Sequence, residues 1–398
     1  MQAQIVLHKL LEKACGQMHQ MRQACLEAVV MGALIGQRLT VTDLGRSLPS
    51  QTSHKHNIKR ADRLLSNTHL HGEWPEIYRQ LARVWIAPKS RPVVVIDWSD
   101  MDEYKHHFVL RASVALQGRS VTVYEEVHTV ATKEKLATHR WFLHQLKAIL
   151  PPQCRPILVT DAGFRTTWFK LVLSMGWDYV GRVRNRHYMR WEHGGRWFDA
   201  KRCYQEASSR PRYLGAGVLT QRNEVHCQFV IYQGKPQGRK HLNRLGEVAE
   251  NSDSRKKAAA QREPWLLATS LPVTTKLAKN VVAIYRMRMS IEEGFRDLKS
   301  HRHGLGLAYH RTHSAERLQM LLLVATLAMM VIWLLGMAAV LKGIHYQYQA
   351  NSVRYKRVLS VVFIGLKMIR EQRIQLTQQD MHKAWITLRQ CLREPLWQ

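Results

Sequence analysis

The stretch Tyr-Arg-Met-Arg-Met-Ser-Ile-Glu-Glu-Gly-Phe-Arg-Asp-Leu-Lys occupies residues 285–299. It is rich in helix-forming residues, contains no Pro and has only Gly294 against it, so its composition predicts one helix. At about 100° per residue, four polar side chains fall within roughly 60° of one another around that helix: Tyr285, Arg288, Glu292 and Lys299. Glu293 lies about 100° further round and cannot share their face.

The face therefore combines a hydroxyl, a guanidinium, a carboxylate and an ammonium. An amphipathic surface helix would also carry charges, but it would scatter them over the side away from its apolar stripe. A single carboxylate flanked by cations instead favours a metal ligand beside a phosphate backbone. Such a ligand needs other carboxylates elsewhere in the chain.

Two acids end short apolar runs. Residues 92–97 read Pro-Val-Val-Val-Ile-Asp and residues 156–161 read Pro-Ile-Leu-Val-Thr-Asp, the pattern of strands buried on both faces. A lone Asp at a strand end is more often a turn or cap residue. Neighbouring strands would nevertheless bring Asp97 and Asp161 together, and with Glu292 they supply the oxygen ligands that hard divalent cations prefer. Two such ions suit phosphoryl transfer. Three rival acids are expected in the loop after the first strand, where sheet pairing does not fix them: Asp100, Asp102 and Glu103.

The composition points to a polyanionic partner. The chain has 398 residues, and 60 Lys+Arg against 30 Asp+Glu give a formal charge of +30. This length predicts two to four domains, and hydrophobic residues make up 45%, which is enough for packed cores. Nucleic acid is the default partner of such a charge surplus. The 6 cysteines form no CxxC pair, so we expect reduced thiols and a cytoplasmic location.

Residues 1–88 are predicted to form a helical DNA-binding domain, because apolar residues recur there at helical spacing. The rhythm resembles a helix–turn–helix and runs into a basic segment at residues 54–63. Lys55, Lys59 and Arg63 follow at i, i+4 and i+8, with Arg60 beside them. This stripe favours contact with a phosphate backbone over a merely solvated face.

The middle of the chain predicts an α/β core interrupted by a β-rich segment. Residues 89–176 combine three strands, a helix, a strand and a helix, the order of a mixed sheet. A hairpin at Gln117-Gly118-Arg119 is predicted to join the second strand to the third. Residues 177–275 are predicted to be a mostly β insertion with strands at 178–183, 225–232 and 265–269. The core then resumes over 276–345 with the helix quoted first, and 346–398 form a helical C-terminal region.

Residues 318–341 are almost wholly apolar and long enough to span a bilayer. In so basic a chain we expect a helix buried on all sides in a large domain instead, and no membrane partner. A basic membrane protein remains the alternative.

The spacing Tyr285-x2-Arg288-x3-Glu292-x6-Lys299 resembles the Y-R-E-K signature of bacterial DDE transposases of the insertion-sequence-four family. Asp97 in Val-Ile-Asp-Trp-Ser-Asp and Asp161 in Val-Thr-Asp-Ala-Gly-Phe are similar to the other two catalytic blocks of that family. The resemblance covers nearly the whole chain. It implies a ribonuclease-H-like mixed-sheet catalytic core, flanked by helical N- and C-terminal regions.

The resemblance also implies a site and an activity. Asp97, Asp161 and Glu292 would be catalytic and would hold two Mg²⁺ ions, with Mn²⁺ as a substitute. Three side chains would grip the DNA backbone near the cleaved end: Tyr285, Arg288 and Lys299. Trp265 would stack on a base flipped out for hairpin formation, although a core Trp of a strand fits it equally well.

Such an enzyme binds the terminal inverted repeats of its insertion sequence, cleaves double-stranded DNA through a hairpin intermediate and joins the 3′ ends to target DNA. The resemblance implies a homodimer on DNA in the bacterial cytoplasm, associated with the nucleoid. A non-catalytic DNA-binding protein is the competing hypothesis, and it predicts salt-sensitive binding without metal-dependent cleavage.

Overall fold

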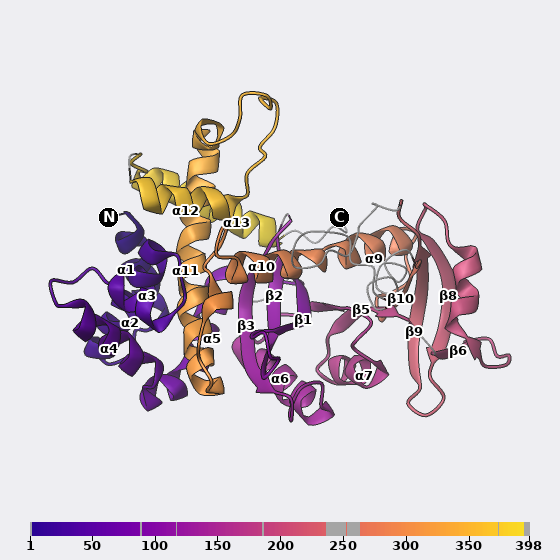
Figure 1. Ribbon diagram of the computed structural model, residues 1–398. Coiled ribbons are helices and arrows are strands. Elements are labelled where there is room, and N and C mark those ends of the chain that lie inside the picture. Colours follow the sequence, from indigo (N-terminus) through magenta and orange to yellow (C-terminus); the bar gives the residue numbers. More distant parts are fainter. Residues whose placement is uncertain are drawn as a thin grey trace. The chain divides into compact units, whose positions relative to one another are not determined.

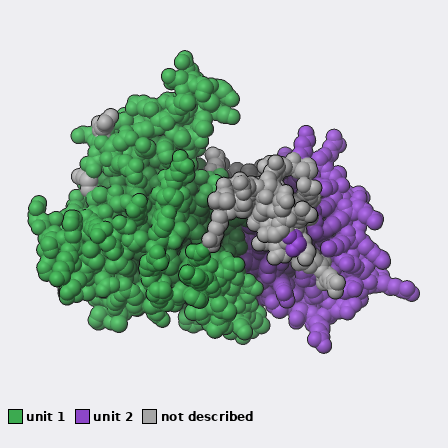
Figure 2. Space-filling model, viewed as in Figure 1, with its two compact units in different colours: residues 1–155, 289–395 green, residues 156–288, 396–398 purple. Residues whose placement is uncertain are grey.

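The computed structural model describes residues 2–87, 90–116, 118–184, 187–235, 252, 263–372 and 374–393. It is a mixed α/β fold, and most of its helices and strands are labelled in Figure 1. The chain divides into two compact units, coloured green and purple in Figure 2. Unit 1 joins residues 1–155 to residues 289–395, and unit 2 takes in Pro156–Arg288. The division into five regions by residue range stays a prediction.

Unit 1 contains three strands and most of the helices. Its strands are β1 (Val93–Asp100), β2 (His107–Ala115) and β3 (Ser120–Thr129). Its helices are α1 (Gln2–Ala14), α2 (Gln20–Gly36), α3 (Val41–Arg46), α4 (His54–Leu65), α5 (Thr68–Trp85), α6 (Leu136–Ile149), α10 (Met289–Lys299), α11 (Ala315–Leu341), α12 (Val361–Glu371) and α13 (Gln378–Arg393). Short 3₁₀ turns are η2 (Leu307–Tyr309) and η3 (Ile344–Gln347).

The three strands of unit 1 lie in the order β3-β2-β1 and are antiparallel. The predicted hairpin joins β2 to β3, where the Leu116 N–H donates to the Arg119 carbonyl oxygen at 2.7 Å. Gly118 has φ 74°, a left-handed conformation that favours glycine; Gln117, which the prediction included, lies outside the described residues. The end predicted for the first strand was wrong: β1 continues to Asp100, which pairs with Phe108.

The N-terminal helices pack closely because glycines stand at their crossings. A Cβ at Gly45 on α3 would lie 2.4 Å from the Ile58 Cα on α4, and one at Gly32 on α2 would lie 2.7 Å from the Leu44 carbonyl oxygen. Only glycine allows backbones to approach so closely. The predicted helical character of this region is confirmed, and α3 packs closely against α4, while α2 contacts both.

The apolar helix α11 is the centre of unit 1. It packs against α1, α2, α5, α12, α13 and β3, and Figure 1 shows it running through the middle of these elements. By length and composition alone it could cross a membrane, with a hydropathy of 2.5, but 83% of its most apolar window is buried inside the protein. The predicted buried core helix is confirmed. Its closest neighbour is α12, where a Cβ at Gly336 would lie 2.1 Å from the Val361 carbonyl oxygen.

Unit 2 is rich in strands. They are β4 (Ile157–Thr160), β5 (Asp178–Val183), β6 (Tyr188–Trp191), β7 (Phe198–Asp199), β8 (Arg212–Leu219), β9 (Val225–Tyr232) and β10 (Trp265–Thr269). Their order is β4-β5-β10-β9-β8-β6-β7; β4 and β5 run parallel, and the following pairs are antiparallel. The helices are α7 (Thr166–Ser174) and α9 (Leu277–Arg286), with a 3₁₀ helix η1 (Ala200–Glu206). The predicted mixed sheet and β-rich insertion are confirmed.

Candidate active site

Asp97 lies on β1, on the sheet face that α10 covers. Side chains alternate along a strand, so Asp97 and Ser99 point to the same face. Ser99 Oγ accepts a hydrogen bond at 2.8 Å from Lys299 Nζ on α10. Arg111, the direct cross-strand partner of Asp97, lies with its guanidinium carbon 4.4 Å from the Phe295 ring centroid on α10. The Asp97 carboxylate, which accepts from the Trp98 N–H at 2.9 Å, is therefore presented to this helix.

Lys299 ties the C-terminal end of α10 to the end of β1. Its Nζ donates to Ser99 Oγ and to the Asp100 carbonyl oxygen. Burial is the main reason why the pKa of Lys299 is lowered to about 8; the Asp100 charge raises this pKa and the Arg111 cation lowers it. The ammonium predicted to grip DNA thus also positions α10 on the strand that carries Asp97.

A second anchor holds the other side of α10. Arg119, at the β2–β3 hairpin, lies 3.3 Å from Glu293 Oε2 and donates from Nε to Asp297 Oδ2 at 2.7 Å. Glu293 also pairs with Arg296. Glu292 is exposed, as is expected of a group that meets a ligand from solution. Glu293 takes part in ion pairs that hold α10, and the choice of Glu292 as the site carboxylate stays a prediction.

Asp161 lies in unit 2, directly after β4. Its Oδ1 accepts from the Gly163 N–H at 2.8 Å, and a Cβ at Gly163 would lie 3.0 Å from that oxygen. The glycine therefore lets the chain close tightly on the carboxylate. Burial raises the pKa of the nearby Tyr285 hydroxyl; the Arg288 cation lowers it, and the Asp161 charge raises it. Unit 2 thus brings Asp161 near the first two residues of the Tyr-Arg-Glu-Lys pattern.

Trp265, at the start of β10, is half-buried and packs edge-on against Tyr285, with ring centroids 4.9 Å apart. It also contacts Tyr232, at 5.7 Å between centroids. The backbone before it is held by Arg182, whose Nη2 donates to the carbonyl oxygens of Glu263 and Pro264 at 3.2 and 3.3 Å. Trp265 is thus attached to the core while keeping part of its ring accessible.

The prediction of one continuous helix over residues 285–299 was wrong. α9 ends at Arg286 and α10 begins at Met289, with Met287 and Arg288 in a turn between them. The N–H groups of Met287 and Arg288 donate to carbonyl oxygens three residues back, to Ile284 at 2.9 Å and to Tyr285 at 3.0 Å. This tightened turn replaces the helical i→i−4 pattern, so the four polar residues do not share one regular helix face.

The basic residues predicted near the N-terminus lie on α4. Lys55, Lys59 and Arg63 are exposed, and Arg60 is half-buried. Lys59, Arg60 and Arg63 line an open groove of about 670 Å³ between the start of α2 and α4. His19, Arg22 and His56 line it too, so its polar wall is mainly cationic or neutral.

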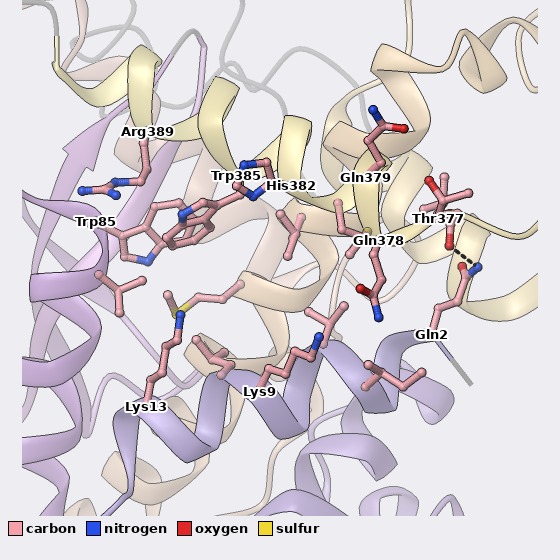
Figure 3. Close-up of a pocket in the computed structure, with 18 of the residues that line it drawn as sticks. Gln2, Lys9, Lys13, Trp85, Thr377, Gln378, Gln379, His382, Trp385 and Arg389 are labelled. Carbon is pink, nitrogen blue, oxygen red and sulfur yellow. Dashed lines mark hydrogen bonds between the residues drawn. The ribbon is translucent and has the colours of Figure 1, made fainter.

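A different cavity, of about 790 Å³, lies among α1, α5, α11 and α13 (Figure 3). Lys9 and Lys13 extend from α1 towards α13, and the rings of Trp85 and Trp385 lie 4.8 Å apart at one end. None of the predicted site residues lines this cavity. It has no part in the candidate active site.

Sequence reasoning missed Arg111 and Glu125. Arg111 donates from Nε to Glu125 Oε2 at 2.8 Å, and its Nη2 lies 2.6 Å from the same oxygen. Both side chains are buried, with 5% and 0% of their surface exposed. Only the strand register reveals the pair, because the two residues are 14 positions apart in the chain.

The donor set fits a hard divalent cation, because Asp97, Asp161 and Glu292 offer only carboxylate oxygens. Asp97 and Glu292 belong to unit 1 and Asp161 to unit 2. Within the part of the chain that the structure describes, no group of three or more His, Cys, Asp or Glu side chains is gathered as a metal site. The fit therefore rests on the chemistry of the ligands.

Comparison with known proteins identifies the family of the chain. No protein of curated function matches the chain. The family model of the transposase DDE domain matches residues 88–330, more than half of the chain, and the matched segment contains Asp97, Asp161 and Glu292. The chain therefore belongs to the transposase DDE domain family, whose members cleave and join DNA and share a ribonuclease-H-like core.

Proposed function

We propose that this transposase excises its insertion sequence by a cut-and-paste route. It binds the terminal inverted repeats, cleaves at the ends of the element and joins the freed 3′ ends to target DNA. The observation that carries the proposal concerns the polar groups around two of the acids. Asp97 lies on β1 under α10, which Lys299 anchors through Ser99, and Asp161 follows β4 near Tyr285, beside which Arg288 also lies.

Asp97, Asp161 and Glu292 would hold two Mg²⁺ ions, for which Mn²⁺ would substitute. Ions bound there would supply Lewis-acid activation of the attacking oxygen and charge neutralisation at the phosphate. In the chain itself, the strand pairing of Asp97 and the anchors of α10 keep two of the carboxylates in place. This preorganisation reduces what must move when DNA binds.

The cations would position the DNA. Tyr285 and Arg288 would grip the backbone near the cleaved strand, and Lys299 would add charge beside Asp97. The α4 residues Lys55, Lys59, Arg60 and Arg63 would follow phosphates of the terminal repeat. The exposure of Lys55, Lys59 and Arg63 supports this role.

The steps are successive phosphoryl transfers. Water first attacks a phosphodiester and releases a 3′-hydroxyl, which then attacks the opposite strand and leaves a hairpin on the element end. A second water opens the hairpin, and the 3′-hydroxyl attacks target DNA. Trp265 would stack on the base displaced by the hairpin, and its partly accessible ring supports that role.

The finer family assignment is also proposed: the insertion-sequence-four family, with segments 110–116 and 56–60 resembling the transposase of the composite tetracycline-resistance transposon. We propose a homodimer acting on double-stranded DNA in the cytoplasm, at the nucleoid and without a membrane partner.

The test is nicking of a duplex that carries the inverted repeat flanking the reading frame. Purified protein should nick it with Mg²⁺ or Mn²⁺ and not with EDTA. D97N, D161N and E292Q should each slow nicking by roughly 10²–10³-fold or more while still shifting the duplex in a gel. A variant that nicks as fast as the unsubstituted protein removes that residue from the site. Binding without metal-dependent nicking by the unsubstituted protein would instead favour the non-catalytic DNA-binding protein.

A further inference from the structure

Three charged residues form a row across the strands of unit 1. The register pairs Asp97 on β1 with Arg111 on β2, and Arg111 with Glu125 on β3. Directly paired residues point to the same sheet face, so the three side chains alternate acid, base, acid on the face under α10. Arg111, in the middle, is within reach of an acid on either side.

The Arg111 guanidinium is directed at Glu125. Two of its nitrogens, Nε and Nη2, lie 2.8 and 2.6 Å from Glu125 Oε2. The other oxygen, Oε1, accepts from the Tyr78 hydroxyl of α5 at 2.8 Å and from Thr326 Oγ1 of α11 at 2.9 Å. Glu125 is thus itself fixed by two helices and cannot easily turn away from Arg111.

A guanidinium across from a metal-binding carboxylate would compete with the metal. Cross-strand neighbours have Cβ atoms about 4.5–5.5 Å apart, so an Arg111 released from Glu125 would reach Asp97 and pair with it. The site is partly buried, where such a pair is strong. A divalent cation would then have to displace Arg111 before Asp97 could bind it.

We propose that Glu125 is a positioning residue that holds Arg111 away from Asp97 and so keeps the Asp97 carboxylate available to the divalent cation. The proposal rests on the proposed function, because it takes Asp97 as a metal ligand. Stability alone does not explain why Arg111 and Glu125 form a buried ion pair, because well-packed apolar residues in their place would stabilise the fold equally well. The proposed role in positioning gives the pair a function.

The experiment measures Mn²⁺ binding to the full chain without DNA, from the loss of the free Mn²⁺ signal in electron paramagnetic resonance. E125Q should weaken Mn²⁺ binding about 10- to 100-fold, the usual effect of losing a group that supports a metal ligand. The double variant R111Q/E125Q should recover affinity to within a few-fold of the unsubstituted protein, because the competing cation is gone.

E126Q is the matched control. Glu126 is a neighbouring buried acid, but it follows Glu125 by one position and so faces the opposite side of β3, where it pairs with His128 at 3.2 Å. Its loss should lower the thermal midpoint without changing Mn²⁺ affinity. Circular dichroism reports whether each variant is folded. If E125Q does not fold, E125D takes its place, and it too should weaken Mn²⁺ binding by drawing the carboxylate back from Arg111.

The outcomes separate the two proposals. If D97N binds Mn²⁺ as well as the unsubstituted protein does, Asp97 is not a ligand and the proposed metal site fails. If D97N loses affinity while folded E125Q, or E125D in its place, keeps it, the metal site stands and the role of Glu125 is overturned. A loss in E125Q that R111Q does not reverse also overturns it.

Discussion

Replacing one or the other of two adjacent glutamates on α10 should have opposite consequences. E293Q breaks contacts with Arg119, at 3.3 Å, and with Arg296; Glu293 and Arg119 are 24% and 22% exposed, and Arg296 is 69% exposed. Partly exposed pairs of this kind contribute about 0.2–1 kcal/mol each, so E293Q should lower the free energy of unfolding by about 1 kcal/mol. E292Q removes no ion pair of this anchor, and its effect on stability should be smaller.

Cleavage should show the reverse order. A carboxylate that holds a catalytic ion supports several kcal/mol of transition-state stabilisation, so E292Q should slow nicking by roughly 10²–10³-fold or more. E293Q should slow it by no more than a few-fold, because Asp297 and Lys299 still anchor α10. The assay is single-turnover nicking of the end duplex, with urea unfolding of the same preparations. Equal losses in the two variants, or an active E292Q, would refute the reasoning.

Three further predictions use the same preparations. Because burial holds the pKa of Lys299 at about 8 in the folded chain, below its ordinary 10.5, the ammonium is charged below that pH and neutral above it. Affinity for the end duplex should therefore fall between about pH 7 and 9.5, and K299R should remove that fall in a fluorescence-anisotropy titration. Because the pKa of Lys299 is lower in the folded than in the unfolded chain, its contribution to the free energy of unfolding should rise from about pH 8 to pH 10.5. G336A should destabilise the protein by about 1–3 kcal/mol because its Cβ would meet the Val361 carbonyl oxygen at 2.1 Å, whereas G72A, with nothing within 4 Å, should stabilise α5 by up to about 1 kcal/mol in thermal melts. K59A should reduce the slope of log affinity against log salt by about 1 without changing sequence preference, and an unchanged slope would remove Lys59 from the DNA contact.

Strands made of β-branched and aromatic residues could be predicted from the sequence. Residues 178–183, 225–232 and 265–269 match β5, β9 and β10 residue for residue. β8 (Arg212–Leu219) could not be predicted, because Gly215 and Gly217 read as a loop and the strand exists through its pairing with β9. Local composition thus identified β5, β9 and β10, whereas β8 forms a strand because it pairs with β9.

The acids of the candidate site could be predicted from the sequence, but the residues that hold them in place could not. Asp97 ends an apolar run in sequence, yet β1 extends to Asp100 because β2 pairs with it as far as Phe108. The partnership of Arg111 and Glu125 follows from strand register, which no spacing in the sequence specifies. A charged residue inside a strand pattern gives no indication of the partner that neutralises it.

The interruption between α9 and α10 changes how the Tyr-Arg-Glu-Lys pattern should be understood. A regular helix would have made it a single face, but the turn at Met287 and Arg288 divides it. Tyr285 and Arg288 belong to unit 2 with Asp161, and Glu292 belongs to unit 1 with Asp97. Each unit therefore holds part of the acid set together with its own polar residues. The spacing of the pattern then reflects two anchored segments, α9 and α10, joined by a short turn. A residue inserted at this turn should therefore reduce the rate of nicking more than it reduces the free energy of unfolding of either unit.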